Sequence, residues 1–78
     1  MEKPEIVFGW VLRQFRKDIN FSQEKLSQES GLDRTYISLL ERGLRQPTLT
    51  SLLKLAAALG VSTVNLVAAV EEKMNENS

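Results

Sequence analysis

Four side chains near the middle of the chain have the chemistry needed to contact nucleic-acid bases. Arg34, Thr35, Ser38 and Leu39 would share one face of a helix. An arginine can bond O6 and N7 of guanine together, a hydroxyl can bond a base edge, and an apolar group can touch a thymine methyl. Arg34 is therefore the first candidate for reading guanine, and Thr35 and Ser38 are candidate base or phosphate contacts. The alternative is that all three are ordinary solvated side chains, although the helix dipole disfavours an arginine near a helix N-terminus.

The residues around this face predict two short helices joined by a tight turn. Ser22 and Asp33 are good helix N-caps, and Gly31 between them suits the left-handed residue that ends a helix. Ser27 is small, as required where the two helices approach each other. Two short helices joined by a glycine-containing turn are typical of a DNA-binding helix-turn-helix, here predicted at about residues 22–43.

Three further helices are predicted from apolar residues at helical spacing. The first runs from Pro4 to Asp18, the fourth starts near Thr48 and stops at Gly60, and the fifth covers about residues 63–75. Strand and hairpin signals are absent from the sequence. We therefore expect one all-α, compact five-helix domain over residues 1–78. The apolar face of its first helix consists of Phe8, Val11, Leu12, Phe15 and Ile19.

Composition narrows the classes of function. The chain of 78 residues has no Cys and no His, so we expect no disulfide, metal site or cofactor. It shows no nucleophile–base pair and no glycine loop for phosphate, so we expect no enzyme. No apolar run approaches the roughly 20 residues of a membrane span, and the N-terminus does not resemble a signal peptide. We expect a cytoplasmic protein that does not contact a membrane and, having no sensor domain, needs no small-molecule ligand.

The formal net charge is zero, but the charges are unevenly distributed. Residues 34–54 contain four basic residues and one acidic residue, whereas the last eight residues contain three acidic residues and one basic residue. A basic middle favours a nucleic-acid partner through its local field. The alternative is a mixed, solvated surface.

Several motifs together resemble a known family. They are FGWVLRQFR, SQEKL, GLDRTYISLLERG, Pro47 after a short loop, and LLKLAAALGVS. In this order and spacing they are similar to the Cro- and phage-repressor-type (XRE) helix-turn-helix proteins. The run LDRTYISLLERG looks most like the controller proteins of restriction–modification systems.

The resemblance implies a lambda-repressor-like fold and a homodimer that binds a pseudo-palindromic double-stranded operator, regulating transcription of its own operon. The alternative is an antitoxin-type or adaptor module whose main partner is a protein.

The resemblance also implies roles for individual residues. Gln23, first in its helix, matches a phosphate-binding position, where free backbone amides favour anions. Leu39 matches a base-contacting position, where it would touch a thymine methyl or else shield the core. Tyr36 would reach a phosphate with its hydroxyl or else pack on the fold. The side chains at the end of the third helix and after it would position the duplex through phosphates: Arg42, Arg45 and Gln46.

Two structural roles complete the prediction. Arg16 and Glu41 resemble a family pair that ties the first helix to the end of the third. The stripe on the fifth helix is predicted as the dimer interface, unless it covers the core of its own domain: Val67, Val70 and Met74. Trp10 falls opposite the Phe8 face, where it would contact a partner or lie half-covered by a neighbouring segment.

Overall fold

The computed structural model describes residues 2–76 and confirms the all-α, five-helix architecture. The helices are α1 (Pro4–Asp18), α2 (Gln23–Ser30), α3 (Arg34–Glu41), α4 (Leu49–Leu59) and α5 (Thr63–Glu76).

Most helix ends follow from local side chains. Ser22 and Thr48 accept hydrogen bonds from the backbone N–H groups of Lys25 and Ser51, so each caps a free donor of the first turn. Gly31 ends α2 in the left-handed conformation, at φ 76°. Asp33 occupies the N-cap position of α3, but its side chain makes no capping hydrogen bond. The boundary predicted at Asp33 is therefore correct, whereas the expected side-chain cap is not formed.

The core is a single cluster to which all five helices contribute. Leu12, Leu26, Ile37, Leu55 and Leu66 are fully buried, one from each helix. The burial of these side chains supplies the main free energy that holds the short helices together, because an isolated helix of eight residues is not stable in water.

The predicted apolar face of α1 differs from the observed one at two positions. Ile19 is 39% exposed, because α1 ends at Asp18 and Ile19 already lies past its last turn. Val7, which the predicted face omits, is fully buried.

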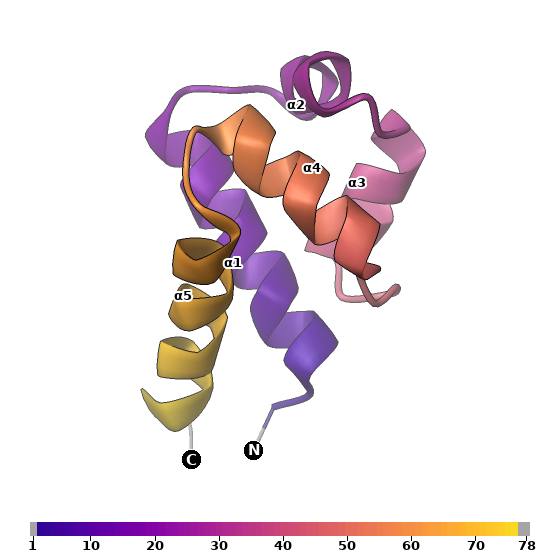
Figure 1. Ribbon diagram of the computed structural model, residues 1–78. Coiled ribbons are helices and arrows are strands. Elements are labelled where there is room, and N and C mark those ends of the chain that lie inside the picture. Colours follow the sequence, from indigo (N-terminus) through magenta and orange to yellow (C-terminus); the bar gives the residue numbers. More distant parts are fainter. Residues whose placement is uncertain (1, 77–78) are drawn as a thin grey trace.

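Helix α1 packs against both α3 and α5, and α4 contacts α2 and α5. Figure 1 shows α1 and α5 side by side, with the start of α1 and the end of α5 at the same end of the molecule. The short pair α2 and α3 lies beyond α4. Helix α3 contacts α1 as well as α2, which fixes its orientation relative to the body of the domain.

Within residues 2–76, no single helix is long and apolar enough to cross a membrane. Helices α4 and α5 meet that length and composition only when taken together, and they are bent by 104° at the break between them.

Candidate nucleic-acid interface

The first turns of α2 and α3 together form a polar surface. Gln23, Arg34, Thr35 and Ser38 line an open hollow of about 190 Å³ between the two helices. Arg34 and Thr35 are exposed, and Ser38 is half-buried. The turn that sets this arrangement is itself held by Ser27, whose hydroxyl donates to the carbonyl of Leu32 at 2.6 Å. The structure therefore brings four of the predicted contact residues to one place.

A buried ion pair lies directly behind this surface. The Nε of Arg16 donates to Oε2 of Glu41 at 2.7 Å, and a terminal guanidinium nitrogen donates to Oε1 at 2.9 Å. The side chains of Arg16 and Glu41 are only 10% and 4% exposed. The hydrogen bonds that Arg16 donates to Glu41 raise the pKa of Arg16 above its ordinary value, outweighing the opposite effect of burial. The pair thus ties α1 to the last turn of α3.

The same network extends to the polar surface. The Nε2 of Gln23 donates to Oε1 of Glu41 at 3.2 Å. The other terminal nitrogen of Arg16 donates to the carbonyl of Phe21 at 2.7 Å. One guanidinium therefore holds both Glu41 and the chain segment that leads into α2.

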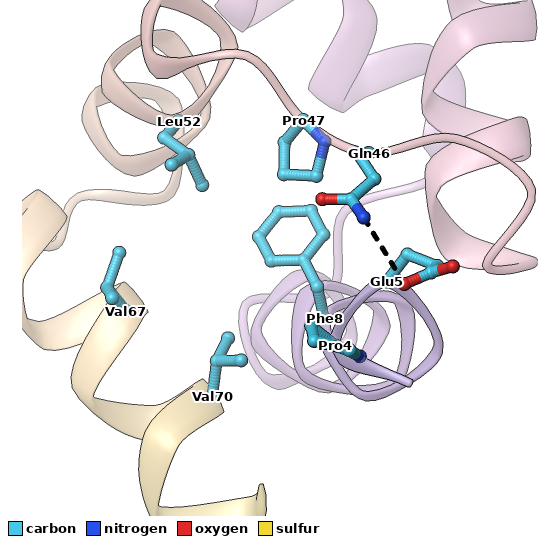
Figure 2. A pocket seen from close by; sticks show the side chains of 8 residues that line it. All are labelled: Pro4, Glu5, Phe8, Gln46, Pro47, Leu52, Val67 and Val70. Atoms are coloured by element: carbon cyan, nitrogen blue, oxygen red, sulfur yellow. Dashed lines mark hydrogen bonds between the residues drawn. The ribbon is translucent and has the colours of Figure 1, made fainter. Parts of the chain in front are cut away.

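The residues that follow α3 form an exposed, basic loop. Arg42 caps the C-terminus of α3, and Arg45 lies further along the loop. Each makes only a local bond to a backbone carbonyl, at 3.4 Å and 3.0 Å. Gln46 donates to Glu5 at 3.4 Å, and Figure 2 shows this contact beside the ring of Phe8, which points toward Pro47. The loop is thus attached to the start of α1 while its two guanidinium groups remain exposed.

The charge of this surface is more positive than its sequence suggests. The acidic residue within 34–54 is Glu41, and Arg16 neutralises it inside the domain. The remaining charged residues of this stretch are Arg34, Arg42, Arg45 and Lys54, all exposed. The outward field of α3 and the loop is therefore cationic, which attracts a polyanion.

Tyr36 and Leu39 are half-buried, as Gln23 and Ser38 are. The hydroxyl of Tyr36 lies 3.0 Å from Oγ of Ser51, and its ring packs against the core. Ser51 is in turn 2.9 Å from the hydroxyl of Thr48. The packing alternative for Tyr36 is therefore realised in this structure, and its phosphate contact stays a prediction. Leu39 is half-buried, which leaves both of its alternatives open.

Gly9 is a positioning residue that the sequence analysis missed. An added Cβ at Gly9 would lie 2.6 Å and 2.7 Å from the carbonyl oxygens of Glu41 and Leu40. Real Cβ atoms essentially never come so close. The sequence signal that could have identified Gly9 is a glycine inside a helical pattern. Such a glycine marks a close approach of another backbone segment when it does not end the helix.

The predicted stripe on α5 is divided between two faces. Val70 and Met74 are half-buried and pack against the core, as the alternative interpretation required. Val67 is 44% exposed, and the outward face continues through Val64, which is 75% exposed, and Ala68. The helix turns Val70 and Met74 inward because they follow fully buried Leu66 at intervals of four residues.

Trp10 lies on a flank of α1 and not opposite its apolar face, because Val11 and Phe15 of that face border the same hollow. It is 44% exposed and lines a shallow hollow of about 200 Å³ with Val11, Gln14, Phe15 and Lys73. The last turns of α5 thus lie beside it. Among residues 2–76, no group of three or more acidic side chains is arranged to hold a metal ion.

Comparison with known proteins identifies relatives over most of the chain. The family model described as Helix-turn-helix matches residues 12–66. The control protein C.BamHI of Bacillus amyloliquefaciens is 46% identical over 63 residues, which are 80% of this chain and 78% of that protein. The "Neisseria hypothetical transcription factor" of Neisseria meningitidis serogroup B is 40% identical over 68 residues, or 87% of this chain. The aligned part is 64% of that relative's own length.

One similar solved structure contains DNA. It is the restriction–modification controller protein C.Esp1396I, a tetramer in complex with its natural 35 base-pair operator. The two chains superpose with a TM-score of 0.83 at 32% identity, covering 92% of this chain and 95% of that one.

Proposed function

The chain belongs to the helix-turn-helix family of DNA-binding transcription regulators, which are not enzymes, and we propose that it binds a specific operator as a homodimer. In this proposal α3 enters the major groove, with Arg34, Thr35 and Ser38 toward the base edges. Arg42 and Arg45 in the following loop approach the phosphates and set the register of the protein on the duplex.

The observation that carries this proposal is the polar hollow shared by α2 and α3. Gln23, at the N-terminus of α2, faces the same space as Arg34, Thr35 and Ser38. A phosphate contact and base contacts are thereby offered from one rigid pair of helices. The neutralisation of Glu41 behind this surface supports it further, since the acidic residue within Arg34–Glu41 is paired inside the domain.

We propose the second copy of this chain as the partner of the outer face of α5. Val64 and Val67 are 75% and 44% exposed, and they line an open, largely apolar hollow with Ala68. Exposed valines on adjacent helical turns favour contact with another apolar surface. A C2 dimer would place two copies of α3 about 34 Å apart, one turn of duplex DNA. Val67 remains part of the proposed interface, whereas Val70 and Met74 support it from the core side.

We further propose that the chain controls a restriction–modification operon. This proposal is supported by the similarity to C.BamHI and C.Esp1396I, the latter crystallised on its natural operator. A regulator of this kind acts in the compartment that holds the DNA, which in bacteria is the cytoplasm. Its operator is expected to be pseudo-palindromic, because protein twofold symmetry is mirrored in the half-sites.

The test is a titration of the purified protein against the duplex upstream of its own gene and against a scrambled duplex of equal length. Specific binding should favour the first duplex by at least about 10³-fold, and affinity should fall steeply as salt rises. Weak and equal binding to both duplexes would contradict operator control by this promoter region. That result would turn attention to a protein partner, the antitoxin or adaptor alternative.

The dimer face is tested separately by sedimentation of Val64→Glu. This substitution places a charge on an exposed side chain, so the domain should fold but remain monomeric and bind the operator poorly. Ile19→Glu is the matched control, because Ile19 is also exposed but lies beyond the end of α1. A Val64→Glu protein that still sediments as a dimer would move the interface elsewhere.

A further inference from the structure

We propose that Glu41, clamped by Arg16, is a positioning residue that aims the carboxamide of Gln23 at the DNA backbone. This inference rests on the proposed function, because it explains how Gln23 is oriented for its proposed contact with the DNA backbone. It gives the buried ion pair a role in binding that goes beyond holding α1 to α3.

The carboxylate of Glu41 is held in one orientation. Both of its oxygens accept from Arg16, at 2.7 Å and 2.9 Å, in a bidentate arrangement. Arg16 is itself anchored at the carbonyl of Phe21, at 2.7 Å. The two side chains are only 4% and 10% exposed, so both are largely shielded from water.

The fixed carboxylate of Glu41 determines which way the Gln23 amide faces. A carboxylate only accepts hydrogen bonds, so the NH₂ group of Gln23 must face it, and the carbonyl must face away. The contact from Nε2 of Gln23 to Oε1 of Glu41 is 3.2 Å. Rotation of the amide by half a turn would bring two oxygens together, which is repulsive. The amide therefore has one orientation instead of two.

The side-chain amide of Gln23 keeps one N–H donor that does not bind Glu41. An amide nitrogen carries two N–H donors about 120° apart, and Glu41 takes one of them. Gln23 also borders the hollow that contains Arg34, Thr35 and Ser38. The second N–H is thus available to a phosphate oxygen next to the first turn of α2, where the backbone amides also favour an anion. Because the side chain is already ordered, binding loses less conformational entropy than it would with a free glutamine.

The decisive experiment is a double-mutant cycle on DNA affinity. Gln23→Met removes the amide at nearly constant volume. The second arm, Arg16→Met combined with Glu41→Met, removes both members of the ion pair together, which is far less disruptive than leaving one charge buried alone. The affinities of wild type, each arm and their combination are measured on the upstream duplex and on the scrambled duplex, and thermal melts confirm that each protein is folded.

In the wild-type background, Gln23→Met should weaken binding of the dimer to both duplexes by about 100-fold, since each of the two protomers loses about tenfold with one hydrogen bond to a charged group. In the apolar-pair background the same substitution should change affinity by less than about twofold, since the amide is no longer aimed. An equal loss in both backgrounds would show that Glu41 does not position Gln23. No loss in the wild-type background would show that Gln23 does not contact DNA. Either result overturns the inference.

A second measurement needs neither DNA nor a variant. In the free wild-type protein, the side-chain N–H signals of Gln23 in an ¹⁵N-correlated NMR spectrum should be shifted apart and exchange slowly with water. Gln28, exposed on the same helix, provides the reference for an ordinary glutamine. Signals of Gln23 that match those of Gln28 would overturn the inference even if operator binding is specific. Shifted signals together with unspecific binding would instead contradict only the proposed function.

Discussion

Substitution of Gly9 by alanine tests whether the contact between α1 and α3 is as close as the structure indicates. In an ordinary helix interior, Gly→Ala stabilises the fold by about 1 kcal/mol. At Gly9 the new methyl would lie 2.6 Å from the carbonyl oxygen of Glu41, a backbone atom that cannot rotate away. The two helices must therefore separate by several tenths of an ångström.

The two effects have opposite signs, and their sizes decide the outcome. Overpacking of a well-packed site costs about 1–3 kcal/mol, and rigid backbone on the opposite side favours the upper end of that range. After subtracting the helix-propensity gain of about 1 kcal/mol, Gly9→Ala should destabilise the domain by about 2 kcal/mol. For a domain of this size that lowers Tm by about 10 °C. Since the displaced atoms belong to Glu41 and Leu40, operator affinity should fall as well.

The assay is urea and thermal unfolding followed by circular dichroism and by the fluorescence of Trp10. Ala57→Gly, at an exposed position within α4, measures the propensity difference without any clash. It should destabilise the domain by about 1 kcal/mol. A Gly9→Ala protein that is more stable than wild type would refute the close contact, because only the propensity effect would then remain.

Three further substitutions separate structural roles from DNA contacts. Arg16→Met leaves the carboxylate of Glu41 buried and unpaired, so the free energy of unfolding in denaturant titrations should fall by about 3–5 kcal/mol. A decrease in that free energy below about 1 kcal/mol would mean that the pair is effectively solvated. Tyr36→Phe removes the bond to Ser51 and should cost about 1 kcal/mol of stability, whereas lost operator affinity at unchanged Tm would assign the hydroxyl to DNA. Arg34→Ala should weaken operator binding by about 1–3 kcal/mol and relax the preference at one base pair; affinities unchanged across a set of single-base operator variants would exclude Arg34 as the reader.

The sequence by itself determined the helices and their order. The residues that cap, turn and stop helices act over three or four positions, so Ser22, Gly31 and Gly60 determine helix ends without reference to the rest of the fold. The apolar spacing of α1 likewise identified Phe8, Val11 and Leu12 as core residues. For the same reason the sequence alone predicts the candidate reading face, because residues at helical spacing within one short helix share a face whatever surrounds it.

The tertiary structure decided everything that depends on how one helix meets another. Periodicity could not say whether Val70 and Met74 face outward or inward, because that depends on where α1 lies beside α5. A glycine is required at position 9 only because the carbonyl groups of α3, about thirty residues away in the chain, lie where a Cβ would be. Contacts between distant segments are set by packing of the whole core, and local patterns contain no information about them. The hydrogen bond that joins Gln23 to Glu41 is of this kind, and it exists because the packing of α1, α2 and α3 brings the two side chains within 3.2 Å.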